Sequence, residues 1–205
     1  MPPRSIAVVV FDGFDELDAI GPYEVLSNLD RAGADVSVTL ASPTPTAVVT
    51  GANGLAVIPD GTLTPTAVDL LVVPGGGWTD GGETGVRAAA EAGDLPDAMA
   101  AAADDDGTVA TVCTGAMLAA GAGLIEDRPA TTHHSATEDL SDAGADLVDA
   151  RVVDDGDLVT AGGVTAGIDL AFWLVEREWD AETAETIAEF IEYEPSGDVH
   201  VASEV

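Results

Sequence analysis

The stretch from Thr108 to Gly121 constrains the fold most, because a strand pattern changes to a helix pattern there at a single cysteine. Residues 108–112 are apolar and partly β-branched, which is typical of a buried strand. Residues 116–120 are helix formers, and Gly121 closes them. A sharp strand-to-helix turn that carries one nucleophilic side chain is a nucleophile elbow. The sequence therefore predicts that Cys113, the only cysteine, stands at such an elbow.

The residues around Cys113 support this prediction. Thr111 and Gly115, two positions before and after the cysteine, are small enough for strand and helix backbones to approach closely. The free N–H groups and the positive dipole at a helix start favour a thiolate over a thiol. A lone cysteine is also typical of a small buried side chain without chemistry. This stretch alone leaves both interpretations open.

Strand patterns alternate with helix patterns along the chain. We expect strands at 5–11, 35–41 and 68–73, hairpins at 47–58 and 151–160, and helices that begin near Gly21, at Ser135 with Glu138 in a capping box, and at Val164. This alternation predicts an α/β fold, a flavodoxin-like three-layer sandwich with a mostly parallel central sheet and helices on both faces. Residues 1–193 are expected to form a single domain, and residues 194–205 an acidic C-terminal tail.

In sheets of this kind the site lies beyond the carboxyl ends of the strands. That rule brings together the loop after Phe11, the glycines after Val73, and Cys113. Asp18 follows the first strand at the start of a helix. A carboxyl group beside a thiolate has a raised pKa through desolvation and like-charge repulsion. The alternative for Asp18 is a carboxylate that stabilises the helix start.

The net charge of −32 excludes several classes of function. All six basic residues are arginines, so the chain has no basic patch for nucleic acid or an anionic membrane. No segment approaches the roughly 20 apolar residues of a membrane span, and we expect a cytoplasmic protein. Acids scattered among well-patterned elements suggest an extreme halophile, in which molar salt screens self-repulsion. Equal melting temperatures at low and molar KCl would contradict that interpretation.

Five segments, which are listed below in chain order, together resemble the ThiJ/PfpI superfamily. This superfamily is related to class I glutamine amidotransferases. They cover nearly the whole chain from about residue 5 to residue 193 and are most similar to the isocyanide hydratase branch. Asp18 stands where many relatives carry a glutamate, and Thr114 stands where the PfpI-type peptidases carry a histidine, which weakens a protease interpretation. The segments are Phe11–Leu26, Pro74–Gly77, Val112–Ala116, Arg128–His133 and Gly162–Ala171.

The resemblance implies hydration of an isocyanide to an N-substituted formamide. Cys113 would be the nucleophile and Asp18 the acid and base, and the Thr114 hydroxyl would hold the thiolate or the substrate. The glycine loop, through Gly75 and the N–H of Gly76, would stabilise developing charge together with the N–H of Thr114. Gly163 and Val164 would line the pocket. These loop glycines also suit an ordinary turn.

The two adjacent histidines were expected on a strand, with side chains on opposite faces, so that at most one faces the site. His133 is then a supporting residue behind the site or, as the less favoured alternative, a catalytic base. No cofactor is expected, and one cysteine beside an adjacent histidine pair gives no spaced set of metal ligands. The expected partners are a small-molecule substrate and, from the resemblance, a second copy in a homodimer.

Other functions remain open on this sequence. A glyoxalase- or deglycase-like enzyme or an amidase of the same superfamily is the first alternative. A non-enzymatic redox sensor is the second, because an exposed thiolate beside a carboxyl group is readily oxidised. A ligand-sensing domain of a transcription regulator is disfavoured, because the chain carries no basic surface.

Overall fold

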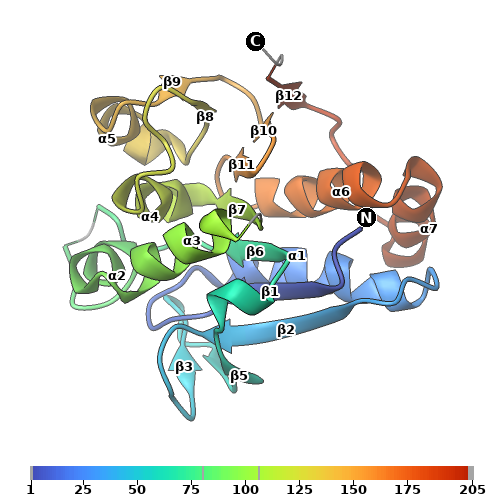
Figure 1. The fold of residues 1–205 in the computed structure, drawn as a ribbon, viewed down its shortest axis with the longest axis horizontal. Helices are drawn as coiled ribbons and strands as arrows, with labels where there is room; N and C mark the ends of the chain where they lie inside the picture. Colours follow the sequence, from blue (N-terminus) through green and yellow to red (C-terminus); the bar gives the residue numbers. More distant parts are fainter. Residues whose placement is uncertain (1, 80, 106, 203–205) are drawn as a thin grey trace.

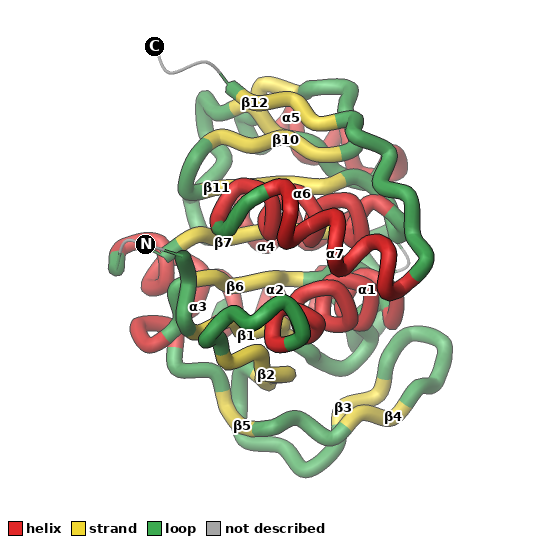
Figure 2. Tube along the Cα trace, turned by 90° about the vertical axis from the view of Figure 1, so that its right-hand side faces the viewer, coloured by secondary structure: helices red, strands yellow, loops and turns green. Residues whose placement is uncertain are grey.

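The computed structural model describes residues 2–79, 81–105 and 107–202. Its centre is one sheet in the strand order β12-β10-β11-β7-β6-β1-β2-β5 (Figures 1 and 2). All neighbours in this sheet pair in parallel except β10 and β11, which form the antiparallel hairpin expected from the sequence. The strands are β1 (Ser5–Val9), β2 (Ser37–Ser42), β5 (Gly61–Thr62), β6 (Leu70–Val73), β7 (Thr108–Val112), β10 (Val152–Asp155), β11 (Leu158–Ala161) and β12 (Val199–Val201).

Helices cover both faces of this sheet, which confirms the predicted three-layer fold. One face carries α1 (Glu16–Ser27), α6 (Ala166–Glu178) and α7 (Ala181–Ile191), which pack together at the front of Figure 2. The other carries α2 (Val86–Ala92), α3 (Asp94–Asp104) and α4 (Ala116–Gly121), with α5 (Thr137–Asp142) beside α4. Two small sheets, β3 (Val49–Thr50) with β4 (Ala56–Val57) and β8 (Pro129–Ala130) with β9 (Asp146–Leu147), complete the fold.

The middle of the sheet is apolar on both faces, as a parallel sheet between two helix layers requires. All four residues of β6 are completely buried, and β7 pairs with β6 on one side and β11 on the other. The register places Val73 opposite Thr111 and Val112 opposite Ala161. The loops after β6, β7 and β11 therefore leave the sheet together at its carboxyl edge.

Helix α1 begins at Glu16, five residues before the predicted start, and contains Pro22. The side chain of Asp15 caps it by accepting the N–H of Leu17 at 3.2 Å. A proline inside a helix removes one backbone hydrogen bond, but here close packing against α6 holds the element. An added Cβ at Gly21 would lie 3.0 Å from Ile168, and one at Gly167 would lie 3.3 Å from Pro22. Tertiary packing thus overrides the local signal.

Two further expectations need correction. Ser135 does not cap α5, because its hydroxyl is bonded to His133 Nδ1 at 2.8 Å; a 3₁₀ turn at His134–Ala136 precedes the helix instead. Part of the expected acidic tail belongs to the sheet, because Val199 to Val201 form β12 beside β10. The N–H of Ser196 anchors this segment by donating to Asp169. Residues 203–205 of that tail lie outside the described part of the chain.

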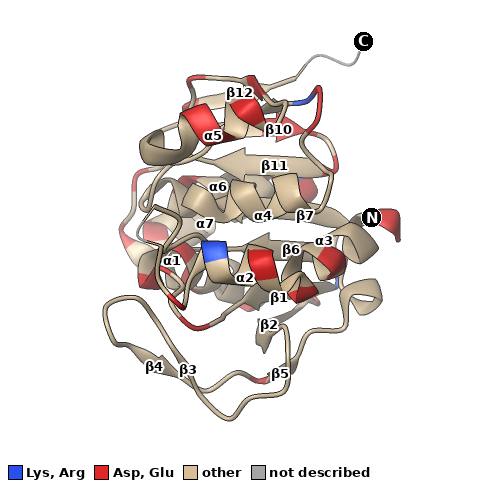
Figure 3. Ribbon diagram, turned by 90° about the vertical axis from the view of Figure 1, so that its left-hand side faces the viewer, with Lys and Arg blue, Asp and Glu red and all other residues tan. Residues whose placement is uncertain are grey.

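Acidic residues are frequent on the side shown in Figure 3, for example on α2, α3 and α5, whereas arginines are few. Each arginine is engaged locally, so none is left to form a cationic patch. Arg31 and Arg87 lie over the rings of Phe190 and Trp78, and the other four pair with acids. No helix in the described residues combines the length and hydropathy needed to span a membrane.

Candidate active site

Cys113 lies at the carboxyl end of β7 in a left-handed backbone conformation, with φ of 58°. This conformation is unfavourable for a residue with a side chain and costs about 1–3 kcal/mol. Two hydrogen bonds hold it: the N–H of Cys113 donates to the carbonyl of Gly162 at 2.9 Å, and the hydroxyl of Thr132 donates to the carbonyl of Cys113 at 2.8 Å. The predicted sharp strand-to-helix elbow at Cys113 is thus present.

The glycines beside the elbow permit its close contacts. A Cβ on Gly115 would lie 2.6 Å from the carbonyl oxygen of Val73, as expected where strand and helix backbones nearly touch. A Cβ on Gly75 would lie 2.6 Å from the backbone nitrogen of Thr114 and 2.9 Å from Cβ of Cys113. The loop after β6 therefore packs directly against the elbow because position 75 has no side chain.

Asp18 is completely buried on the first turn of α1, beside this elbow. Its Oδ2 accepts the N–H of Gly75 at 3.0 Å, whereas Oδ1 has no hydrogen-bond partner among the described residues. Burial, with a smaller contribution from the charge of Asp15, raises the pKa of Asp18 to about 7. The thiol of Cys113 is close enough to lower that pKa slightly, although it does not reach full hydrogen-bond geometry.

The thiol of Cys113 departs from the sequence expectation of a favoured thiolate. Burial and the neighbouring Asp18 carboxylate raise its pKa to about 12. The backbone N–H groups of Thr114 and Val164 interact with the sulfur and lower the pKa, as a helix start should, but their effect is smaller. At neutral pH the resting pair is therefore a thiol beside a carboxyl group that titrates near 7, with the two titrations coupled.

The glycine loop is arranged differently from the prediction. The N–H of Gly76 donates to the Thr114 hydroxyl at 3.0 Å, so this amide does not point to a substrate oxyanion in the resting structure. Likewise, the N–H of Gly75 donates to the carboxylate of Asp18. The two amides position the carboxylate and the Thr114 side chain, and Thr114 itself is buried next to Cys113. The N–H groups closest to the sulfur are those of Thr114 and Val164.

Gly163 and Val164 lie in the loop between β11 and α6, and the N–H of Val164 interacts with the Cys113 sulfur. A Cβ on Gly163 would lie only 2.4 Å from the ring of His133, so the histidine packs directly on this backbone. The two histidine rings lie together, with centroids 4.0 Å apart, and do not point to opposite faces of a strand. The chain turns into 3₁₀ geometry at His134, which removes the alternation of a strand. Burial lowers the pKa of His133.

Three further residues shape the site, beyond those that the sequence analysis assigned to it. Asp15 influences the pKa of both Asp18 and His133, and Thr132 and Gly162 hold the Cys113 backbone. Asp15 carried a detectable signal as a helix-cap residue before α1. Thr132 and Gly162 act across the fold, so no local pattern identifies them. In the described residues, no group of three or more His, Cys, Asp or Glu side chains is arranged to hold a metal ion.

Comparisons with known proteins agree with this geometry. The isonitrile hydratase of Pseudomonas putida is 35% identical over 193 residues, which cover 94% of this chain and 79% of that protein. A deglycase of Pyrococcus abyssi is 29% identical over 159 residues, covering 76% of this chain and 88% of the relative. The structure of a ThiJ/PfpI family protein from Pseudomonas syringae superposes with a TM-score of 0.82 at 29% identity, covering 96% of this chain and 77% of that one.

The profile of the DJ-1/PfpI family matches residues 4–177, which include the elbow, the glycine loop and α1. The order of the five sequence segments, the mostly parallel sheet and the strained cysteine agree with that match. This chain therefore belongs to the DJ-1/PfpI family.

Proposed function

We propose that the protein hydrates an isocyanide, or a similarly small electrophile, to an N-substituted formamide. The observation that carries the proposal is the buried Asp18 carboxyl group beside the Cys113 thiol, with a pKa raised to about 7. A base with a pKa near the working pH transfers protons efficiently in both directions. The similarity to the isonitrile hydratase of Pseudomonas putida supplies the substrate class.

In the first step, the Asp18 carboxylate takes the thiol proton of Cys113 and passes it to the terminal carbon of the isocyanide. The sulfur bonds to the same carbon, which gives a thioimidate in which that carbon carries one hydrogen. The thiol has thereby added across the carbon, and Asp18 is again a carboxylate. The strained elbow keeps the sulfur in reach, and the N–H groups of Thr114 and Val164 stabilise negative charge as it develops on sulfur.

In the second step, Asp18 removes a proton from water while the water oxygen bonds to the thioimidate carbon. Asp18 then gives that same proton to the nitrogen and is again a carboxylate. The tetrahedral adduct then breaks its carbon–sulfur bond, and the hydroxyl proton returns to the sulfur through Asp18. The products are the N-substituted formamide and the free thiol. One carboxyl group therefore serves both as base and as acid, which explains why a second titratable catalyst is not required.

The first experiment follows N-substituted formamide formation from an aryl isocyanide in molar KCl, for the wild type and Cys113→Ala. We expect turnover by the wild type and none by the variant, with matched melting curves as the folding control. Because Asp18 must begin as the carboxylate, kcat/KM should fall as pH falls through about 7. A well-folded wild type without turnover would contradict the proposal.

A deglycase- or glyoxalase-like activity is the second candidate, because a deglycase of Pyrococcus abyssi aligns over 76% of this chain. Such a reaction also needs a cysteine and a carboxyl group, so the geometry alone does not separate the two chemistries. Loss of methylglyoxal without isocyanide turnover would select this candidate. Oxidation of Cys113 without any turnover, read by intact mass after mild peroxide, would select the redox sensor.

We also propose that the protein forms a homodimer through the β3–β4 hairpin. Ile58 and Leu55 on this hairpin are 76% and 46% exposed, and Leu17 on the adjacent helix is 38% exposed. Glu16 fixes the hairpin to α1 by accepting the N–H of Asn53 at 2.7 Å. An apolar surface of this kind typically marks a contact site. Sedimentation should show a dimer that Ile58→Glu converts to monomer; a monomeric wild type would contradict the assignment.

A further inference from the structure

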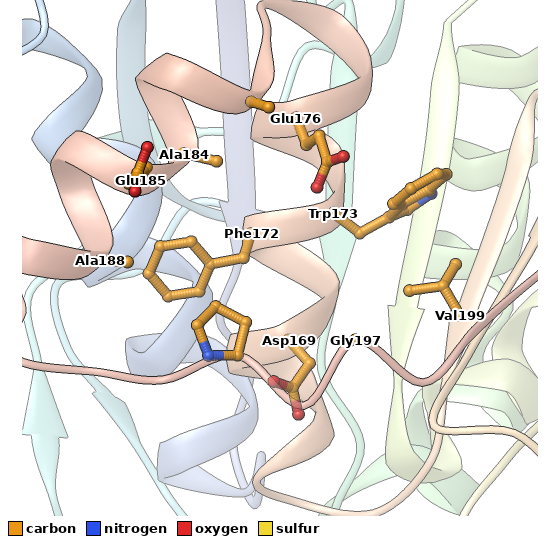
Figure 4. A pocket seen from close by; sticks show the side chains of 11 residues that line it. Asp169, Phe172, Trp173, Glu176, Ala184, Glu185, Ala188, Gly197 and Val199 are labelled. Carbon is orange, nitrogen blue, oxygen red and sulfur yellow. The ribbon is translucent and has the colours of Figure 1, made fainter.

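A cavity of about 390 Å³ lies between α6, α7 and the segment that leads into β12 (Figure 4). None of the residues that line it belongs to the Cys113 site, so the inference below does not depend on the proposed hydration. A cavity of this size falls in the range that small organic ligands occupy in proteins, about 300–1,000 Å³.

Two aromatic rings stand on either side of this space, as Figure 4 shows. Phe172 is 3% exposed and stacks on Tyr193 with ring centroids 5.6 Å apart. The indole N–H of Trp173 donates to Asp154 at 2.7 Å, which fixes the ring. Ala184 and Val199 complete the apolar walls. Both rings are thus held in place before any ligand arrives, which reduces the entropy lost on binding.

The charged groups of the cavity are all acidic. Asp169 is already fully engaged, because it accepts bonds from Arg151, Tyr193 and the backbone of Ser196. Glu176 and Glu185, one on each helix, have no hydrogen-bond or ion-pair partner in the part of the chain that the structure describes, and no arginine lines the space there. Figure 4 shows the carboxylate of Glu176 above the gap between the two rings, at the end opposite Asp169.

We propose that this cavity binds a small organic cation, an ammonium group carried on an aromatic or branched apolar body. The body would lie between Phe172 and Trp173, and the ammonium group would lie by the Glu176 carboxylate. Aromatic faces and carboxylates both attract an alkylammonium group, and the apolar walls favour its hydrocarbon part. A bare metal ion does not fit this arrangement, because the acids do not converge into a group of metal ligands within the described residues.

The test is calorimetric titration with 2-phenylethylammonium chloride in molar KCl, where general attraction to the acidic surface is screened. We expect saturable binding at one site on the wild type and much weaker binding of the neutral isostere 2-phenylethanol. Glu176→Gln should weaken binding about threefold, because Glu176 is exposed and molar salt partly screens its attraction to the ammonium group. Ala184→Leu, which fills part of the cavity, should weaken it as well.

Glu189→Gln is the matched control, because Glu189 is an exposed acid on α7 outside the cavity. Its affinity should equal that of the wild type. Equal loss in both glutamine variants, equal binding of the alcohol, or no saturable binding would each overturn the proposal.

Discussion

Asp18 and Asp169 are two of the three aspartates that are buried in the described residues, and their surroundings differ. Asp169 on α6 is 4% exposed, and its two oxygens accept bonds from Arg151, Tyr193 and Ser196 at 2.7, 3.1 and 2.9 Å. Asp18 on α1 is 0% exposed, accepts a single backbone N–H, and has one oxygen without a partner in the described residues. The first carboxylate is fully satisfied, and the second is not.

This difference distinguishes a carboxylate that stabilises the fold from one whose pKa is strongly shifted. A buried carboxylate with a cationic partner and several donors ties elements together, as Asp169 ties α6 to the segment before β12. A buried carboxyl group with one donor is destabilised when ionised, and the pKa of Asp18 rises to about 7. The unfavourable charge of Asp18 lies beside the strained Cys113, where the proposed reaction needs a proton that moves easily.

The largest expected effect is on catalysis. Asp18→Asn keeps the size and an acceptor for the N–H of Gly75 but removes the titrating group. If the site works as proposed, kcat/KM should fall about 10²–10⁴-fold, the usual contribution of an acid–base catalyst. Asp169→Asn is the comparison variant and should leave kcat/KM nearly unchanged, since Asp169 does not contact the reacting groups. Similar losses in both variants would mean that the two carboxylates do not differ in role.

Asp18→Asn should stabilise the fold, although it should lower kcat/KM. Folding raises the pKa of Asp18 from about 3.8 to about 7, so the ionised form is penalised only in the folded state. The penalty is fully present above pH 7, declines as pH falls, and is absent below about pH 4. Asp18→Asn should therefore raise the free energy of unfolding at about pH 8 by at most about 4 kcal/mol. Urea titrations at about pH 8 and at about pH 4 measure this gain in the free energy of unfolding. An equal gain at the two pH values would contradict the buried charge as its cause.

Asp169→Asn should instead destabilise the fold. The substitution leaves the guanidinium of Arg151 without its anionic partner, and breaking such a pair in a buried setting costs about 3 kcal/mol. Arg151 is itself one-third exposed, with 34% of its side chain accessible, so hydration reduces this cost. The loss should persist at about pH 8, where Asp18→Asn gives its full gain. Urea titration of both variants side by side gives the two signs directly, and equal signs would refute the contrast.

Local signals in the sequence predicted much of this molecule. The strand-to-helix change at Cys113, the alternation of strands and helices, and the small residue at Gly115 each follow from neighbours in the chain, and the structure has all three. The raised pKa of Asp18 also followed from placing a carboxyl group at the carboxyl edge of the sheet. These features depend on periodicity and on short-range geometry, which a single sequence records.

The features that sequence analysis missed depend on contacts between distant segments. Thr132 and Gly162 hold Cys113 from other loops, β12 pairs with a strand more than forty residues earlier, and α6 allows Pro22 inside α1. The raised pKa of Cys113 has the same origin, because the helix start favours the thiolate locally while burial opposes it more strongly. The pairing of Gly76 with Thr114 likewise appears only when β6 and β7 are adjacent.

The smallest effect on stability and activity should come from Gly163→Ala. This variant tests the loop between β11 and α6, which contacts the surroundings of both Asp18 and Asp169. The two residues after Gly163 contact the surroundings of both aspartates. The Val164 N–H interacts with the sulfur of Cys113, and the Thr165 hydroxyl accepts a hydrogen bond from Arg151 at 3.3 Å. A methyl group at position 163 would lie 2.4 Å from the His133 ring, so the ring or the loop must shift. Overpacking of this kind costs about 1–3 kcal/mol. We expect a loss of stability near 1 kcal/mol and a lower kcat/KM.

Gly162→Ala, whose added Cβ has no neighbour closer than 3.8 Å, is the matched control and should have a smaller effect. Equal losses would show that the contact with His133 is not what requires glycine at 163.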